Sequence, residues 1–122
     1  MKEERLHLLL GVSGGIAAYK MPLLIRLLKK NNVEVKVVLT KAARTLVGED
    51  ALRTVSGNTV FFDEISPTYD MDHIRLAEWA DLFLICPATA NTIAKLAHGI
   101  ADNLLTTLAL SFDGILMIAP AM

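Results

Sequence analysis

The chain has 122 residues, enough for one compact domain with a real core and too few for two ordinary ones. Hydrophobic residues make up 53% of it and charged residues 20%, a composition that excludes intrinsic disorder. Twelve basic and thirteen acidic side chains leave a formal net charge of -1, so the chain lacks the basic excess of nucleic-acid-binding proteins. We therefore predict a single domain over residues 1–122 and no nucleic-acid partner.

Local sequence patterns argue against a membrane-spanning protein and against a secreted protein. The longest apolar runs, at residues 8–12 and 82–86, are strand-sized and far below the roughly 18 residues of a membrane span. The first residues lead directly into the apolar segment 6–10 without a signal-peptide pattern, which predicts a cytoplasmic location. The single cysteine, Cys86, lies within an apolar run, and we interpret it as a buried small hydrophobe without chemistry of its own.

The first half of the chain alternates between strand and helix patterns. Residues 6–11 form a continuous apolar run that ends in glycine, typical of a strand buried on both faces. Apolar residues at helical spacing predict a helix over 16–30, and β-branched residues predict a second strand over 33–39. Residues 41–56 indicate one or two helical segments interrupted near Gly48. Such a βα connection between parallel strands is right-handed in nearly all known cases.

The second half continues the alternation after an irregular part. Residues 57–72 contain a short extended piece at 59–62 and a turn at 66–68, and we interpret them as an excursion from the core. The elements expected next are a short helix at 73–80, a third core strand at 82–86 ended by Pro87, a helix at 89–97 closed by Gly99, a helix at 103–110 capped by Asp102, a turn at 113–114 and a fourth strand at 115–119. This order predicts a parallel α/β sandwich.

Four loops should meet at one edge of that sheet. Ligands of open parallel sheets bind beyond the carboxyl ends of the strands, which here are followed by residues 11–15, 40–42, 87–92 and 120–122. All four segments are small, polar or rich in glycine. Turns and helix caps alone could explain each of them. Their convergence on one rim nevertheless favours a binding site there.

The loop at 11–15 carries the clearest signal for a ligand. Its three glycines let the backbone come close to a ligand, and the helix that begins near Gly15 offers free N–H groups to a phosphate. The glycine spacing is not that of a dinucleotide site, and no acid follows the second strand to bind a ribose. We therefore predict FMN rather than NAD, with its phosphate held by the hydroxyls of Ser13 and Thr40 and the amides of Gly14 and Gly15.

Five motifs, in family order, resemble those of the flavin-dependent cysteine decarboxylases and cover the chain nearly end to end. They are GVSGGIAAYK at 11–20, HIRLAEWAD at 73–81, PATANTIAK at 87–95, GIADNLLT at 99–106 and APAM at 119–122. The resemblance implies a Rossmann-like, flavodoxin-like three-layer α/β/α sandwich with a parallel sheet. It also implies a flavoprotein that assembles as homotrimers, or as dodecamers built from them, with FMN near the subunit interface.

The resemblance also assigns roles to single residues, with no metal ligand among them. His73 matches the family's active-site histidine, which could accept or return a proton near neutral pH. Its position alone would suit a surface residue or a helix cap equally well. Asp102 and Asn103 match a family segment near the flavin and the trimer contact, with a plain helix cap as the alternative. The flavin contacts implied by the resemblance are Ser13, Gly14, Gly15, Ile16, Thr40, Lys41, Ala42, Thr89, Ala90, Asn91, Thr92 and Ala121.

Within the family the resemblance implies one reaction above others. It is the FMN-dependent oxidative decarboxylation of 4′-phospho-N-pantothenoylcysteine to 4′-phosphopantetheine in coenzyme A biosynthesis. FMN would take two electrons from the cysteine side chain, which eases the loss of CO₂, and would then return them. The family continues after Pro-Ala-Met into an Asn that binds the substrate carboxylate, and later supplies a Cys. The chain ends at Met122, so relative to the family the domain is C-terminally incomplete, and the activity of this piece alone is left open.

Three alternatives to this function stay open. A peptidyl-cysteine decarboxylase would perform the same chemistry on a peptide's C-terminal cysteine. A non-catalytic FMN-binding regulatory subunit would bind the flavin and a partner, and the sequence downstream of Met122 would distinguish it. Prenyl-flavin synthases share the FMN site but are not expected to combine His73 with the Pro-Ala-Met motif. In each case the high apolar content predicts an oligomer. Its expected contacts are the helix from Asp102 to Leu110 and Trp79, for which a place in the core is the alternative.

Overall fold

The computed structural model of the chain describes residues 5–62 and 69–121. Within these residues five parallel strands form one sheet in the order β3-β2-β1-β4-β5. The strands are β1 (Leu6–Val12), β2 (Val33–Leu39), β3 (Val60–Phe62), β4 (Leu82–Ala88) and β5 (Ile115–Pro120). The helical elements are η1 (Ile16–Lys20), α1 (Met21–Lys30), η2 (Ala43–Thr45), α2 (Glu49–Ser56), α3 (Tyr69–Trp79), α4 (Ala90–His98) and α5 (Leu104–Ser111).

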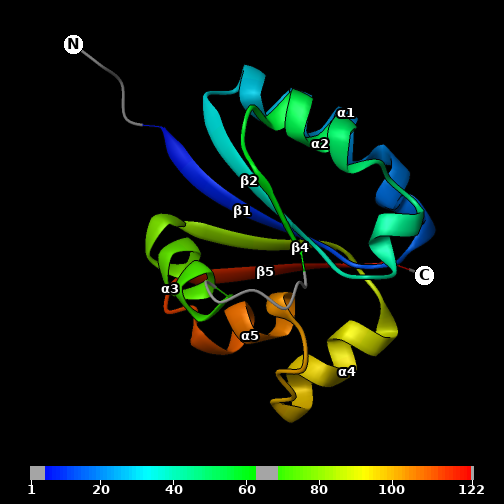
Figure 1. The fold of residues 1–122 in the computed structure, drawn as a ribbon, viewed down its shortest axis with the longest axis vertical. Coiled ribbons are helices and arrows are strands. Elements are labelled where there is room, and N and C mark those ends of the chain that lie inside the picture. The colour runs from blue at the N-terminus through cyan, green and yellow to red at the C-terminus, as the bar shows by residue number, and fades with distance from the viewer. Residues whose placement is uncertain (1–4, 63–68, 122) are drawn as a thin grey trace.

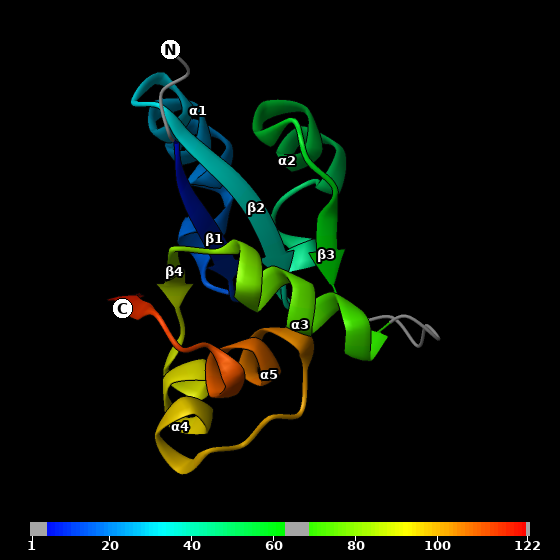
Figure 2. The same ribbon diagram turned by 90° about the vertical axis from the view of Figure 1, so that its left-hand side faces the viewer.

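The central strands are buried on both faces because helices cover both sides of the sheet. Leu8 and Leu10 of β1 face a core shared with η1, α1 and α2, whereas Leu9 faces a second core with α3 and α5. Phe83 of β4 is fully buried in that second core. Figures 1 and 2 show α1 and α2 on one side of the sheet and α3 and α5 on the other. The predicted α/β/α sandwich with a parallel sheet is therefore confirmed.

The helix expected over residues 16–30 is divided in the structure. A 3₁₀ segment, η1, comes first, and the α-helix α1 begins at Met21 with Pro22 in its first turn. Proline has no N–H to donate to an earlier carbonyl, so it suits the start of an α-helix and not its interior. Gly48 separates η2 from α2, which confirms the interruption expected there.

The extended piece at residues 59–62 belongs to the sheet, so its interpretation as an excursion from the core was wrong. Val60–Phe62 forms β3, which pairs in parallel with the end of β2 through Val37 and Val60. Apolar residues on a short edge strand can complete both cores, and a three-residue segment is too short to reveal this by its periodicity. The turn expected at 66–68 lies outside the described residues. The following helix, α3, begins at Tyr69, before the expected position.

Pro87 does not end the third core strand, contrary to expectation. β4 continues through it to Ala88, the Cys86–Pro87 peptide bond is cis, and the pairing with β5 shifts register between Ile85 and Ala88. A proline cannot donate to a ladder, and it is tolerated where the pairing is irregular. Cys86 is only half-buried, and burial raises the pKa of its thiol, which agrees with the inert role expected for it.

The C-terminal cap of α4 agrees with the sequence prediction, but the start of α4 and the cap of α5 do not. Thr89 accepts a hydrogen bond from Thr92 N, and Gly99 closes α4 with φ +70°. Asn103, not Asp102, is the N-cap of α5. The carboxylate of Asp102 instead pairs with the Lys95 ammonium at 3.1 Å.

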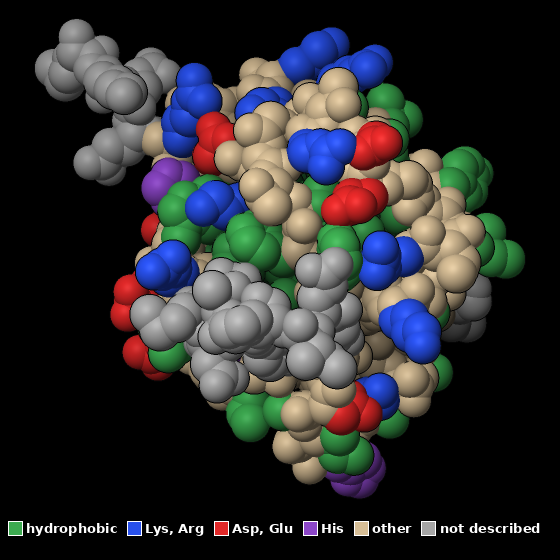
Figure 3. Space-filling view, in the orientation of Figure 1, with side chains coloured by type: hydrophobic (Ala, Val, Ile, Leu, Met, Phe, Trp, Pro, Cys, Tyr) green, Lys and Arg blue, Asp and Glu red, His purple; other side chains and the backbone are tan. Residues whose placement is uncertain are grey.

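Apolar side chains remain exposed on two surfaces. One is a stripe along η1 and α1, visible at the right-hand edge of Figure 3, made of Ile16, Tyr19, Leu23 and Leu27. We call it the η1–α1 stripe. The other is β5, the edge of the described sheet, whose side chains at residues 115–118 are exposed on both faces. In the described part of the chain, no helix combines the length and apolar character needed to cross a membrane.

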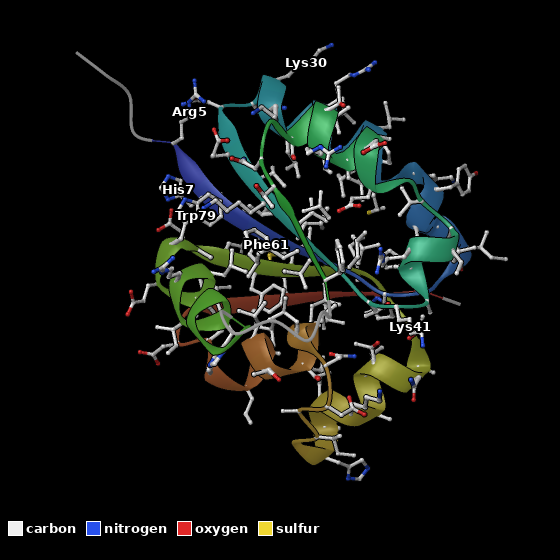
Figure 4. All side chains as sticks on the ribbon, viewed as in Figure 1. Arg5, His7, Lys30, Lys41, Phe61 and Trp79 are labelled. Carbon is white, nitrogen blue, oxygen red and sulfur yellow. The ribbon has the colours of Figure 1, made fainter. Side chains whose placement is uncertain are left out.

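Trp79, expected either in the core or at a subunit contact, packs within the protomer. Its ring stacks on His7 with centroids 4.6 Å apart, and Lys36 Nζ lies 4.5 Å from its centroid. Figure 4 shows Trp79 and His7 side by side. Half of α5, the other expected contact, is buried as well. The apolar surface available to a partner is therefore found elsewhere, on the η1–α1 stripe and β5.

Candidate functional site

Loops that follow the strands are tied together at the carboxyl edge of the sheet. Ser13 N donates to Pro87 O at 3.2 Å, which joins the loop after β1 to the end of β4. Thr40 N donates to Val12 O at 3.0 Å and Ala121 N to Ala88 O at 2.9 Å. These backbone hydrogen bonds hold the loops expected at the binding rim in fixed positions.

A cavity of about 380 Å³ lies where the loops after β1, β2 and β4 meet α4. Its volume falls in the roughly 300 to 1,000 Å³ range of small-molecule sites. Figure 4 shows Lys41 beside the beginning of α4, at the mouth of this region. The residues that line it are Gly14, Thr40, Lys41, Ala42, Thr89, Asn91, Thr92, Lys95 and Asn103.

The charges around the cavity favour an anionic ligand. Lys41 and Lys95 line it, but the Lys95 ammonium is already paired with Asp102 at 3.1 Å, so the positive charge available to a ligand is that of Lys41. Lys and Arg side chains lie along this side of the molecule, between the loop after β2 and α4 (Figure 3). The first turn of α4 adds backbone N–H groups, at Ala90 and Asn91, that have no partner within the helix, together with the positive end of its dipole.

Two threonine hydroxyls in the lining can donate to such a ligand. Thr40 Oγ1 accepts a hydrogen bond from Ala43 N at 3.2 Å, and Thr92 Oγ1 accepts one from Thr89 Oγ1 at 3.2 Å. A hydroxyl accepts and donates at the same time, so both O–H groups can still be directed at an anion. These hydrogen bonds hold the two threonine side chains in place and leave their O–H groups able to donate to a ligand.

The hydroxyl of Ser13 has a different task from the one expected. Ser13 is 1% exposed, its Oγ donates to Pro87 O, and the same atom accepts from Thr89 N at 2.9 Å. Phosphate oxygens only accept, and a serine has a single O–H to give. Because that O–H is donated to Pro87, Ser13 shapes the rim by joining two loops and does not present its hydroxyl to the cavity.

The glycines at this rim are required by the contacts between loops. A Cβ on Gly14 would lie 2.5 Å from the Cβ of Ala42, closer than real Cβ atoms come. A Cβ on Gly15 would lie 3.3 Å from side-chain atoms of Pro87 and Ala121. We expected these glycines to let the backbone come close to a ligand. In the structure, Gly14 first of all lets its loop come close to Ala42, and Gly15 lets it come close to Pro87 and Ala121.

The structure brings most of the expected flavin contacts together, but not all of them. Ala90 begins α4 beside the cavity without lining it. Gly15 and Ala121 face each other and Pro87, and Ile16 is 80% exposed on the surface. Those that line the cavity are Gly14, Thr40, Lys41, Ala42, Thr89, Asn91 and Thr92.

Sequence reasoning missed Lys95 and Asn103 as lining residues. Lys95 follows Thr92 at the i, i+3 spacing of one helix face, so the placement of Thr92 at the rim could have predicted it. Asn103 was expected only as part of a cap or of a segment near the flavin, and its contact with the cavity depends on how α5 packs against α4.

His73 does not line the cavity. It lies on α3, which packs against α5, and it is half-buried. Its Nδ1 atom is buried and has no hydrogen-bond partner in the described structure. A buried imidazole nitrogen without a partner costs free energy, and functional groups are one setting in which such atoms are retained.

Comparisons with known proteins show which proteins the chain resembles. A profile of the family described as Flavoprotein matches residues 1–122. The "Coenzyme A biosynthesis bifunctional protein CoaBC" of Vibrio vulnificus is 48% identical over 117 residues, which are 94% of this chain and 29% of that protein. The chain thus spans less than a third of this curated relative's length.

Two solved structures have the same fold over nearly the whole chain. The FMN-dependent cysteine decarboxylase TvaF from thioviridamide biosynthesis has a TM-score of 0.89 at 30% identity, covering 98% of this chain and 75% of that one. A PPC decarboxylase variant complexed with pantothenoylaminoethenethiol has a TM-score of 0.83 at 32% identity, covering 98% and 68%.

Proposed function

The chain belongs to the flavoprotein family, and on that premise we propose that it binds FMN in the cavity at the carboxyl edge of its sheet. We further propose that the protein it forms catalyses the oxidative decarboxylation of 4′-phospho-N-pantothenoylcysteine. The observation that carries the proposal is the cavity itself, lined by Lys41, hydroxyl donors and the beginning of α4. The 48% identity to a coenzyme A biosynthesis protein supports the choice of substrate.

The residues present fit FMN by charge and by donor set. A phosphate monoester carries about two negative charges near neutral pH and accepts hydrogen bonds through all its terminal oxygens. Thr40, Thr92 and Lys41 offer side-chain donors, and the N–H groups at the beginning of α4 offer backbone donors. No carboxylate in the described lining opposes them.

FMN and the chain have different roles in the proposed reaction. FMN, when bound, would supply two-electron redox chemistry for the cysteine side chain. The chain binds the phosphate at the rim loops and holds these loops through Ser13, Pro87 and Thr89. Fixed loops give the bound flavin one orientation toward the substrate.

We assign the proton transfer to His73. Its Nδ1 is buried and unpartnered in the described structure, and an imidazole exchanges a proton near neutral pH. Because His73 lies on α3 and outside the lining of the cavity, the proposal is that it meets the substrate's thiol and not the flavin phosphate. It would accept or return that proton during the reaction.

A second candidate, a peptidyl-cysteine decarboxylase, uses the same site on a different substrate. The structural similarity to the peptidyl-cysteine decarboxylase EpiD, with a TM-score of 0.85 at 32% identity, favours it. An assay with phosphopantothenoylcysteine and with a peptide ending in cysteine, each at equal concentration, separates the two. We expect turnover of the phosphorylated small molecule and little of the peptide. Turnover of neither by flavin-loaded protein would favour the non-catalytic regulatory subunit.

The proposal includes assembly as a homotrimer, or as a dodecamer built from trimers, in the cytoplasm. Exposed apolar side chains on the η1–α1 stripe begin at Ile16, directly after the loop that forms part of the rim. A partner on this surface would lie next to the FMN site and would hide apolar area from water.

Identification of the bound chromophore tests the cofactor. Denaturation of the purified protein should release a yellow compound whose mass is that of FMN. Added riboflavin, which lacks the phosphate, should bind much more weakly, because the donors and Lys41 at the rim act on a phosphate. Release of FAD or of a nicotinamide would reject the assignment.

Substitution of His73 separates binding from chemistry. Asn in this position keeps a polar side chain but does not titrate near pH 7, so His73→Asn should retain FMN while decarboxylation falls by about 10² or more. Flavin absorbance per protomer and the rate of CO₂ release are the two measurements. A proportional loss of both would make His73 a structural residue or a cofactor-holding one.

A further inference from the structure

Asn103 combines a helix cap with a place in the wall of the cavity. It is the N-cap of α5, and its Oδ1 accepts hydrogen bonds at 2.8 Å from both Thr106 N and Thr106 Oγ1. Thr106 Oγ1 in turn accepts from Asn103 N at 3.2 Å, completing a capping box. The same residue lines the cavity together with Lys95.

The capping box fixes which end of the Asn103 amide faces the fold. A backbone N–H can only donate, so the side-chain atom that meets Thr106 N must be the oxygen. The amide nitrogen, Nδ2, then occupies the other end of the planar group and carries two N–H donors. The polarity of this side chain is therefore set by the fold before any ligand binds.

The backbone before Asn103 is held as well. Asp102 pairs with Lys95 at 3.1 Å, and Ile100 N donates to Lys95 O at 2.9 Å. The connection from α4 to α5 is thus anchored to α4 on one side of Asn103 and to Thr106 on the other. A donor held in this way loses little freedom when it meets a ligand.

We propose that Asn103 Nδ2 donates a hydrogen bond to an acceptor atom of the FMN bound in the cavity, so that one side chain caps α5 and binds the cofactor. This inference rests on the proposed function, since it takes FMN as the ligand. The inference also explains why residue 103 is an asparagine. Asp and Ser cap helices as well as Asn does, but only Asn joins the capping oxygen to an amide N–H group.

Two substitutions keep the cap and change the donor. Asn103→Asp has the same shape and an accepting oxygen for Thr106, but it puts an acidic acceptor where the amide donor stood. Asn103→Ser keeps the cap without adding charge and shortens the side chain. Asn103→Ala removes both functions and serves as the comparison for a lost cap.

The test is the dissociation constant of FMN, measured by titrating flavin-free protein and following flavin fluorescence, with thermal unfolding of the flavin-free protein in parallel. We expect Asn103→Ser to weaken FMN binding by roughly 2- to 10-fold, the scale of one lost hydrogen bond, and Asn103→Asp to weaken it further. Both should unfold at the wild-type temperature, whereas Asn103→Ala should unfold earlier. Wild-type affinity in both capped variants would overturn the inference and leave the FMN proposal standing. Failure of the wild-type protein to bind FMN would instead reject the proposed function.

Discussion

Several residues around the cavity have two tasks, one in the fold and one toward the ligand that we propose. Thr40 accepts from Ala43 N and Thr92 accepts from Thr89 Oγ1, while their own O–H groups can still donate. Gly14 differs, because its contribution is the absence of a side chain. At that position the loop after β1 comes within van der Waals contact of Ala42 after β2, and the rim depends on this contact.

Gly14→Ala should destabilise the protein by about 1 to 3 kcal/mol, because its new Cβ would lie 2.5 Å from that of Ala42. Combining it with Ala42→Gly removes the closest atom and should restore most of the loss. Chemical unfolding of the single and double variants measures both effects, and FMN affinity should follow the same order.

Gly48→Ala is the matched control for this pair of substitutions. No atom lies within 4 Å of a Cβ placed on Gly48, whose φ of -74° is accessible to alanine. We expect a smaller loss than for Gly14→Ala, about 0.5 to 1 kcal/mol, because alanine is a poorer N-cap than glycine but meets no steric conflict here. Equal destabilisation by Gly14→Ala and Gly48→Ala would show that the contact with Ala42 does not limit residue 14.

Among the elements, β2 is joined to three other segments through the half-buried carboxylate of Glu34. Asn58 Nδ2, from the segment after α2, donates to it at 2.8 Å, and Arg5 and Lys29 pair with it at 3.0 and 3.6 Å. The hydrogen bond from Asn58 is the largest cause that lowers the pKa of Glu34, followed by the effects of Arg5 and Lys29, against an opposing effect of burial. This carboxylate is therefore bound more strongly when ionised.

The stability supplied by Glu34 should disappear in acid. A carboxyl with a lowered pKa in the folded state stabilises the fold above its unfolded pKa, near 4.5, and loses that contribution as the pH falls through its folded pKa. Glu34→Gln should therefore be less stable than the wild type at pH 7, with the difference shrinking as the pH falls below about 4.5. Thermal unfolding at a series of pH values measures this.

The exposed residue Glu78, on α3, provides the control for this effect. Glu78→Gln changes the net charge by the same amount, and surface substitutions away from special features usually alter stability by no more than about 0.5 kcal/mol. A difference between wild type and Glu34→Gln that stayed constant down to pH 2 would contradict the role assigned to the ionised carboxylate.

For the whole molecule, the main feature is apolar surface that the described residues leave uncovered. Leu23 and Tyr19 on the η1–α1 stripe are each 60% exposed, and Ile115 at the start of β5 is 67% exposed. Contiguous apolar patches of this kind mark interaction surfaces. β5 also presents one of the two unpaired edges of the described sheet, which can recruit a further strand.

The protein should therefore have a mass above that of a monomer at micromolar concentration, as measured by light scattering. Leu23→Glu, in the middle of the η1–α1 stripe, should lower that mass, because it places a charge in a surface that must become dry. Arg26→Glu on the same helix is the control for added negative charge, since Arg26 is exposed and outside the stripe. Met117→Lys tests β5 in the same way. A monomer mass for the unmodified protein would contradict the prediction.

The sequence by itself determined the order and type of most elements, because those features depend on local periodicity. The apolar run of β1, the helical spacing in α1, the interruption at Gly48 and the left-handed Gly99 all act over a few residues. The position of the binding rim could be predicted from the sequence for the same reason. Once the strands are parallel, their carboxyl ends must share one edge, and Gly14, Thr40 and Thr92 fall there.

Only the tertiary structure decided which neighbours each polar group would meet. Asp102 and Asn103 are both good caps, and the choice between them depended on Lys95, which takes the carboxylate of Asp102 from the adjacent helix. Ser13 could have faced a ligand, but Pro87 and Thr89 from a distant part of the chain use its hydroxyl. The contacts of Ser13 join residues that are far apart in sequence. In the case of Asp102, a residue of another helix, Lys95, decides between two caps that are equally possible locally. Because a hydrogen bond acts only over about 3 Å, its partner is set by packing and not by local pattern.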